Sequence, residues 1–366
     1  MVIETRTATA PEIRLRAAPG YTVPEPETVW FKALDGHWLN FKHLPPAPER
    51  AVDRGPVILV HGAGVRANLL CPPTTLTLPA MLSAAGFDVW MLNWRSSIDL
   101  RPIEWNLDDA AVLDYPVAVK VILQQTKRDT LKAFIHCQGS CSFLMSMVAG
   151  KLPQVSTVVA NSSGLHPLVP WPARIKLPIA MFALAPFVDW FDPQYGLYAP
   201  RFWPKVMDWI VRSFHHECSN AVCKHASFVY GFGFPTMWNH DNLDDETHEW
   251  LKGEFGAVPV KVFRQIARCV AKGRLVSMGD YPEEVLPREF AERNPKLDTT
   301  FHLITGADNR TFRPAAMKKT AWFLNSFSGS DRHSFHEFPG YGHMDIFVGK
   351  NAHNDVYPYI IAKLSE

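Results

Sequence analysis

The sequence predicts an α/β protein with a mostly parallel central sheet and helices on both of its faces. Residues 56–60 form a continuous apolar run, which is typical of a strand buried on both sides. Apolar runs and helix-like segments then alternate along residues 56–164 and return after residue 299, as βαβ units do. At residues 134–140 an apolar run stops and a helical pattern begins at once. This abrupt junction predicts a strand, a sharp turn and a helix.

The elements follow in order from a Pro- and Ala-rich stretch at residues 1–25, which we expect to be an extended arm. Two alternating runs joined at Asp35-Gly36 predict a β-hairpin, because Asp-Gly adopts the positive φ of a tight turn. The strands of this hairpin are predicted at 28–33 and 37–42. The further predicted strands are 56–60, 87–92, 132–135, 155–160, 300–305 and 333–338. The predicted helices are 77–85, 107–125 with a possible kink at Pro116, 140–150, 314–324 and 354–364.

The βαβ pattern is interrupted in the middle of the chain. Residues 165–298 are instead rich in aromatic residues, methionine and proline. We therefore divide the chain into an arm (1–25), a core (26–164 and 299–366) and a mainly helical cap (165–298) inserted after a core strand. Laid over the turn at 134–140, such a cap would exclude water and line an apolar pocket.

The composition favours a globular protein with one large core. Of the 366 residues, 47% are hydrophobic and 20% are charged, and the net charge of +1 argues against a nucleic-acid partner. No run of 18 apolar residues is present, and residues 1–6 lack the apolar segment of a signal peptide. We expect a cytoplasmic protein without a membrane span.

The six cysteines do not form a disulfide framework at this length. Cys218 and Cys223 have C-x4-C spacing, and the histidines nearest in sequence are His215, His216 and His225. Since no second Cys/His pair at ligand spacing is close by, we expect neither a zinc site nor any other cofactor.

The turn at 134–140 places Cys137 where a nucleophile would stand. A side chain at such a strand–helix junction is strained and exposed to substrate, and helix amides favour a thiolate there. Ser140 is the alternative nucleophile, but it lies three residues later and would face along the first helical turn. The structural alternative is that Cys137 is a buried, unreactive cysteine. We prefer Cys137 because suitable partners occur elsewhere in the chain.

The loop that follows the strand 56–60 reads His61-Gly62-Ala63-Gly64. Glycines let the backbone approach a substrate closely, so we expect the N–H groups of Ala63 and Gln138 to stabilise an oxyanion. A dinucleotide-binding loop is excluded because the third glycine is missing and no acidic residue ends the next strand.

A carboxylate and a histidine complete the predicted triad. Asp308 lies in the loop after a late strand, and His343 lies in the glycine-rich loop after the last strand. The acid would orient the imidazole and the imidazole would act as the base. Asp345 is a weaker candidate for the acid, and an Asx turn is the structural alternative for Asp308.

Several segments together resemble the hydrolase domain fused to cholesterol-oxidase-like GMC flavoproteins, a branch of the α/β-hydrolase superfamily, and more remotely acid lipases. These segments are 93–97, 136–140, 217–218 with Cys223, 240–243 and 341–350. The resemblance covers about residues 27–364 and implies an α/β-hydrolase fold with cysteine as nucleophile. It supports Cys137, Asp308 and His343 as the triad. We expect His61, Gly62, Trp94, Arg95 and His240 to contact substrate. No G-x-G-x-x-G motif opens this chain, so no redox role is implied.

These features predict acyl transfer through an S-acyl enzyme. The first hypothesis is hydrolysis of an ester or thioester with a bulky hydrophobic group, for which CoA and acyl carrier protein are candidate carriers. The second is an acyltransferase or carbon–carbon bond-forming enzyme, which resembles the polyhydroxyalkanoate synthases in its nucleophile. A non-catalytic protein that binds hydrophobic ligands is the third. Acceptor identity separates the first two, because a site that excludes water after acylation favours transfer.

Overall fold

The computed structural model describes residues 13, 15–183, 186–200, 202–233, 235–328 and 332–366. The arm predicted at residues 1–25 lies mostly outside this description. Its described part has no regular structure, and the backbone of Arg16 accepts a hydrogen bond from Thr77 N at 2.9 Å. No helix among the described residues has the length and apolar character needed to cross a membrane.

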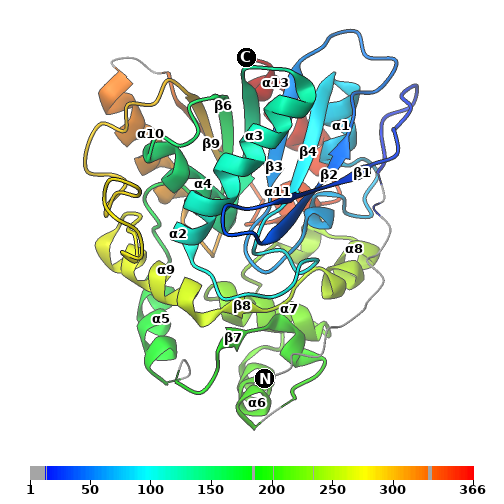
Figure 1. Cartoon of the computed structure of the whole chain (residues 1–366). Coiled ribbons are helices and arrows are strands. Elements are labelled where there is room, and N and C mark those ends of the chain that lie inside the picture. Colours follow the sequence, from blue (N-terminus) through cyan, green and yellow to red (C-terminus); the bar gives the residue numbers. More distant parts are fainter. Residues whose placement is uncertain (1–12, 14, 184–185, 201, 234, 329–331) are drawn as a thin grey trace.

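An eight-stranded sheet forms the centre of the molecule, in the order β1-β2-β4-β3-β5-β6-β9-β10 (Figure 1). Its strands are β1 (Glu27–Lys32), β2 (Trp38–Leu44), β3 (Gly55–Val60), β4 (Phe87–Asn93), β5 (Leu131–His136), β6 (Val155–Asn161), β9 (Thr300–Gly306) and β10 (Ser334–Phe338). β1 and β2 form the predicted antiparallel hairpin, and β2 pairs antiparallel with β4, while the remaining pairs are parallel. The predicted α/β class is confirmed.

Helices cover both faces of this sheet because its central strands are apolar on both sides. Ile58 and Val60 pack into one core layer with α3 and α4, whereas Val57 and Leu59 pack into the opposite layer with α1 and α13. The helices of the core are α1 (Leu78–Ala84), α2 (Leu107–Asp109), α3 (Tyr115–Thr126), α4 (Cys137–Val148), α10 (Pro314–Ser328), α11 (Asp345–Val348), α12 (Ala352–Asp355) and α13 (Tyr357–Ser365).

The single helix predicted over residues 107–125 is divided. A π-helical segment, η2 (Ala110–Asp114), separates α2 from α3, and Pro116 lies in the first turn of α3. A proline has no N–H to donate and its ring crowds the preceding turn, so the wider π turn ahead of Pro116 accommodates it. The predicted kink therefore takes the form of a π segment.

The segment between β6 and β9 is an insertion, because these two strands pair directly in the sheet. It lies below the sheet in Figure 1 and is called the cap here. The cap contains α5 (Trp171–Ala183), β7 (Trp190–Phe191), η3 (Pro193–Gly196), α6 (Phe202–Phe214), α7 (Ala221–Tyr230), η4 (His240–Asn242), α8 (Asp245–Trp250), η5 (Leu251–Gly253), β8 (Val258–Pro259) and α9 (Val260–Lys272).

A buried ion pair holds the cap on the core. Arg66, which follows the loop after β3, donates through Nε and Nη2 to the Glu254 carboxylate at 2.9 and 2.8 Å, and through Nη1 to Asp99 at 3.0 Å. Bidentate contacts between a guanidinium and a carboxylate fix the relative orientation of the two groups as well as stabilising them. The cap is therefore anchored beside the loop that carries Ala63, one of the two predicted oxyanion amides.

Candidate active site

Cys137 occupies the sharp turn between β5 and α4. It is the first residue of α4 and has a φ of 55°, a left-handed conformation that non-glycine residues rarely adopt. Two glycines permit the turn. A Cβ on Gly139 would lie 2.2 Å from the His61 carbonyl oxygen, and one on Gly62 would lie 3.1 Å from Cys137 Cβ. The strained strand–helix junction expected from residues 134–140 is therefore present.

The Cys137 thiol is enclosed, with 4% of the residue exposed. Burial raises the pKa of this thiol to about 12, and hydrogen bonds from the backbone amides of Gln138 and Ala63 act in the opposite direction. These are the two amides predicted to form the oxyanion hole. The expected thiolate is not stabilised in this closed state, because desolvation outweighs the helix amides. At rest the nucleophile candidate is a neutral thiol.

Two imidazoles lie next to this sulfur. The sulfur and one ring nitrogen from each of His136 and His343 lie within 4.8 Å of one another, and the two rings are 4.8 Å apart between centroids. Burial lowers the pKa of His343 to about 3. Neither nitrogen of His343 has a hydrogen-bond partner among the described residues. His343 is thus a neutral imidazole with a free lone pair beside the thiol.

His136 has a different environment from His343. The Asn161 amide donates to its Nδ1 at 3.1 Å, which fixes the remaining proton on Nε2. Burial, with smaller contributions from His343 and His61, keeps the pKa of His136 well below its usual value. This ring can donate a hydrogen bond into the site but has no free lone pair. His343 is therefore the better candidate for the base.

The structure does not bring Asp308 to His343. Asp308 follows β9, and its backbone N–H donates to the Tyr341 carbonyl at 2.8 Å, so the two loops lie side by side. Its side chain nevertheless faces solvent. Because this backbone pairing directs the carboxylate outward, the predicted hydrogen bond between Asp308 and His343 is not formed.

Asp345, the alternative acid, accepts hydrogen bonds from the histidine loop and from the cap, and none from the His343 imidazole. It is fully buried and accepts hydrogen bonds from Gly342 N at 2.8 Å, Asn239 N at 3.2 Å and Asn242 Nδ2 at 2.6 Å. Burial raises the pKa of its carboxyl group to about 6. Asp345 therefore joins the histidine loop to η4 of the cap.

Ser140, the alternative nucleophile, is fully buried and donates to the Ser163 carbonyl at 2.6 Å. Its hydroxyl stabilises the packing of α4 against the loop after β6. This contact leaves Cys137 as the nucleophile candidate at the turn.

The residues predicted to contact substrate have mixed outcomes. Gly62 lies against Cys137, as expected, and His61 Nδ1 donates to the Gly62 carbonyl at 2.7 Å. Trp94, however, is fully buried and donates to the His61 carbonyl at 3.0 Å. Arg95 forms a buried ion pair with Asp114, whose carboxylate accepts from Nε at 2.9 Å. Trp94 therefore supports the loop after β3, and Arg95 joins the loop after β4 to η2, so neither side chain faces a substrate.

His240 belongs to a separate group in the cap. Its Nε2 lies 3.4 Å from Cys223 Sγ, and no contact with the catalytic residues is found among the described residues. The prediction that His240 contacts substrate is therefore not supported by its position.

The cap covers the catalytic turn, but several of its aromatic side chains face solvent. Tyr230 at the end of α7 donates to the Ala63 carbonyl at 3.1 Å, so the cap rests directly on the oxyanion loop. Trp171, Phe182 and Trp209 are instead 73%, 86% and 70% exposed. They lie on outward faces of α5 and α6, so these three side chains do not line the predicted apolar pocket over the turn.

Among the residues that the structure describes, two groups of side chains have the geometry to hold a metal ion. One is His136, Cys137 and His343, and the other is Cys218, Cys223, His240 and His248 in the cap. In the first group, His136 already uses one nitrogen to bind Asn161. Sequence reasoning missed the roles of His136 and His248. The position of His136 directly before the nucleophile was the available signal, whereas His248 lies in α8, which is separated from the helix of Cys223 by η4.

Comparisons with known proteins give the context for this geometry. No model of a known protein family matches the chain. It is 27% identical over 187 residues to human lipase member M, covering 46% of this chain and 43% of that protein. It is 25% identical over 150 residues to lysosomal acid lipase/cholesteryl ester hydrolase of Macaca fascicularis, covering 37% of each. The chain thus matches less than half the length of these curated relatives.

Solved structures with a similar fold include a soluble variant of monoglyceride lipase from Saccharomyces cerevisiae, with a TM-score of 0.56, 16% identity and coverage of 96% and 97% of the two chains. An esterase from Exiguobacterium antarcticum has a TM-score of 0.57, 8% identity and coverage of 93% and 100%. The strand order, the turn at Cys137 and these similarities place this chain among the proteins with the α/β-hydrolase fold.

Proposed function

We propose that this protein is an enzyme that hydrolyses carboxylic esters or thioesters through an S-acyl intermediate on Cys137. The observation that carries the proposal is the position of a strained cysteine between two backbone amides and an unpartnered imidazole. The similarity to lipases and esterases supports ester hydrolysis. The cysteine nucleophile rests on the geometry and on the resemblance to the hydrolase domain of GMC flavoproteins, which stays a prediction.

The chemistry starts from neutral groups. As the Cys137 sulfur attacks the ester carbonyl carbon, His343 accepts the thiol proton, and the amides of Ala63 and Gln138 donate to the developing oxyanion. The intermediate collapses to a thioester and the leaving alcohol receives the proton from His343. Water then attacks the thioester while His343 accepts one of its protons, and the acid and the free thiol are formed.

A bulky hydrophobic acyl or ring group is the substrate class that fits best. The enclosed catalytic group favours an apolar substrate over a polar one. Because Cys137 and His343 are covered, productive binding requires the cap to move away from the oxyanion loop. Delivery of the acyl group on CoA or acyl carrier protein, and a cytoplasmic location, stay predictions.

Turnover of a series of p-nitrophenyl esters of increasing chain length tests the proposal. We expect Cys137→Ala to reduce kcat/KM by about 10³-fold or more, because the covalent step is lost. Ser140→Ala is the matched control and should stay within about tenfold of the parent, since Ser140 only donates to a backbone carbonyl. Full activity of Cys137→Ala, or loss of activity in Ser140→Ala alone, contradicts the proposal.

Acyl transfer is the second candidate function. The observation that favours it is the enclosure of Cys137 and His343, because a thioester shielded from water persists until another acceptor arrives. Partitioning of the acyl group between water and an added alcohol, amine or thiol distinguishes the two functions. A product ratio that follows the acceptor at millimolar concentration indicates transfer, and free acid at every concentration indicates hydrolysis.

A further inference from the structure

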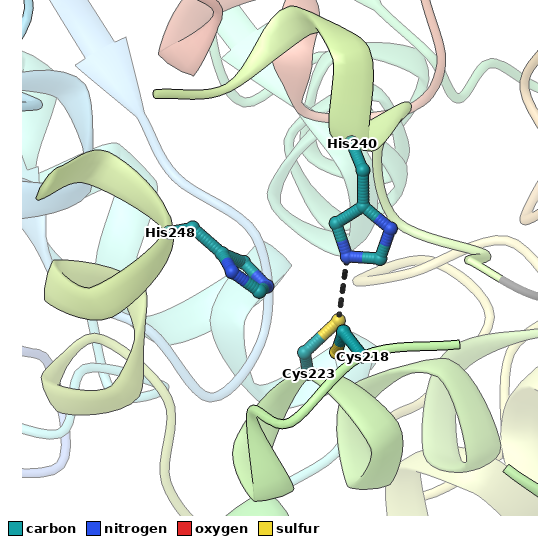
Figure 2. Close-up of side chains that lie close together, drawn as sticks. All are labelled: Cys218, Cys223, His240 and His248. Carbon is teal, nitrogen blue, oxygen red and sulfur yellow. Dashed lines mark hydrogen bonds between the residues drawn. The ribbon is translucent and has the colours of Figure 1, made fainter. Parts of the chain in front are cut away.

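Four potential metal ligands meet in the cap, away from the catalytic turn. Cys218 precedes α7, Cys223 lies in its first turn, His240 begins η4 and His248 lies in α8. One ligand atom from each lies within 4.8 Å of the others, and Figure 2 shows the side chains converging from separate segments. We propose that Cys218, Cys223, His240 and His248 form a structural zinc site.

The Cys223–His240 distance in this group is that of a tetrahedral site. Zn–S bonds of about 2.3 Å and Zn–N bonds of about 2.0 Å put tetrahedral ligand atoms roughly 3.3–3.8 Å apart. The Cys223 sulfur and His240 Nε2 are 3.4 Å apart, within this range. The rings of His240 and His248 are 4.8 Å apart between centroids and nearly perpendicular, at 79°. Two such rings can direct a nitrogen at the same point without clashing.

The ligand atoms are available. All six cysteines are free thiols, so Cys218 and Cys223 are not joined by a disulfide. The Nε2 atom of His248 is buried and has no hydrogen-bond partner among the described residues. A buried polar atom without a partner is destabilising, and coordination of a metal would remove that destabilisation. The unpartnered nitrogen points independently to a ligand at this place.

The chemistry of the four ligands selects the metal. Thiolates are soft ligands that favour zinc over magnesium or calcium, which prefer oxygen. Two thiolates and two neutral imidazoles also balance the two positive charges of Zn²⁺, and a neutral complex suits a partly buried position. All four positions of the tetrahedron come from the protein, so no position is open for a substrate. This is the pattern of a structural and not a catalytic zinc site.

The backbone around the group is already ordered for binding. Asn220 caps α7 by accepting a hydrogen bond from Cys223 N at 3.1 Å, and its Nδ2 donates to the His248 carbonyl at 2.7 Å. Asp244 caps α8 by accepting from Thr247 N at 2.7 Å. These contacts join the cysteine segment to the helix of His248, so little ordering of the main chain is needed on metal binding.

The segments that form the proposed zinc site also contact two catalytic loops, the loop that carries Ala63 and the loop that carries His343. α7 carries Cys223 at one end and Tyr230 at the other, where Tyr230 donates to the Ala63 carbonyl. η4 carries His240 and also Asn242, whose Nδ2 donates to Asp345 in the histidine loop at 2.6 Å. Zinc would therefore stabilise the segments that hold the oxyanion loop and the His343 loop in place.

The expectation of no zinc site rested on the lack of a second Cys/His pair at ligand spacing near Cys218 and Cys223. Two of the histidines nearest to them in sequence have other partners. His215 lies 3.2 Å from Glu217, and His225 Nε2 lies 3.0 Å from Asp208. The residues that meet the cysteines lie 17 and 25 positions after Cys223, at a spacing that no common zinc motif has.

Metal analysis of the full chain, purified under reducing conditions without chelator, tests the site. We expect about one zinc per chain. Chelator-treated protein reconstituted with Co²⁺ should show the ligand-field absorption of a tetrahedral site and a thiolate-to-cobalt charge-transfer band. This measurement uses the parent protein, so it does not depend on any variant folding. Failure to take up Zn²⁺ or Co²⁺, or a disulfide between Cys218 and Cys223 in reduced protein, overturns the proposal.

Variants identify the ligands. His248→Ala and Cys223→Ser should lose at least nine-tenths of the zinc and lower the melting temperature, whereas His248→Cys, which restores a ligand, should retain zinc. His216→Ala is the matched control, because His216 is exposed in the same segment and lies outside the group. If zinc is instead lost in His343→Ala and retained in Cys223→Ser, the metal occupies the catalytic group and the proposal is wrong.

Discussion

At the scale of single residues, burial decides the protonation states of the catalytic pair. Removal from water raises the pKa of the Cys137 thiol to about 12 and lowers that of His343 to about 3, so the pair is neutral at rest. The site thus differs from thiol enzymes that maintain a thiolate–imidazolium pair. The thiol proton must therefore be transferred as the sulfur attacks the substrate, and the lone pair of His343 is needed to accept it. A carboxylate hydrogen-bonded to His343 is less important in such a site.

The exposed position of Asp308 leads to a quantitative expectation. Asp308→Asn should reduce kcat/KM by less than about tenfold, whereas His343→Ala should reduce it by about 10³-fold or more, because the carboxylate does not contact the imidazole and the imidazole accepts the thiol proton. Steady-state kinetics on one ester substrate measures both. Equal losses in the two variants would show that Asp308 reaches His343 during the reaction, as in a complete triad.

At the scale of elements, the catalytic turn depends on how closely α4 approaches the loop after β3. Gly139 allows this approach, since its α-carbon faces the His61 carbonyl with no room for a side chain. Cys137 has a strained backbone at the same turn. The strain persists because the packing of β3, β5 and α4 determines the path of the chain.

Substitution of this glycine measures the closeness of the packing. Gly139→Ala should lower the free energy of unfolding by about 3 kcal/mol, because a Cβ placed 2.2 Å from a carbonyl oxygen forces the helix away from the loop. Urea unfolding gives the value. Gly253→Ala is the matched control, since its Cβ would meet no atom closer than 4.0 Å and its φ is not in the left-handed region. Similar small effects in both variants would contradict the account.

The elements of the core could be predicted from the sequence, because local patterns specify them. The hairpin at Asp35-Gly36, the buried strand at 55–60 and the turn at Cys137 each have a signal within a few residues. The π segment at 110–114 and the outward direction of the Asp308 carboxylate depend on packing between distant segments. No local pattern reports such contacts.

At the scale of the whole molecule, the sheet and the cap together bury several titratable groups. Burial lowers the pKa of His61 to about 4 and that of His343 to about 3, and raises that of Asp345 to about 6. A histidine whose pKa is lowered by folding binds protons more readily when unfolded, so acid favours unfolding between its usual and its folded pKa. Asp345 acts in the opposite direction, because its folded state is the one that binds the proton more readily.

The balance of these groups predicts a protein that loses stability in acid. Between pH 7.5 and 4.5, His343 and His61 should each lower the free energy of unfolding by about 2.5 kcal/mol and Asp345 should raise it by about 2 kcal/mol. These three groups give a loss of about 3 kcal/mol, and the lowered pKa of His136 acts in the same direction. Urea unfolding at the two pH values measures the loss. His343→Leu should have a smaller pH dependence than the parent. Equal or greater stability at pH 4.5, as expected of a protein adapted to an acidic compartment, would contradict this prediction.

The covering of the core by the cap was the part of the architecture least accessible from the sequence. Its helical, aromatic-rich character was predicted, yet Trp171 and Phe182 face outward and His248 meets Cys223 across three elements. Hydrophobic composition shows only that apolar side chains must be buried within the protein or covered by a ligand. It does not show which face of a helix turns inward, because that depends on partners far away in the chain.

The most direct test of the catalytic account is to trap the acyl enzyme. The protein is incubated briefly with a slowly turned-over p-nitrophenyl ester, quenched in acid and analysed by intact mass and peptide mapping. The account predicts one acyl group per chain, on the peptide that contains Cys137, labile to hydroxylamine as a thioester is, and absent from Cys137→Ala. An acyl group on Ser140 or on any other residue would contradict it.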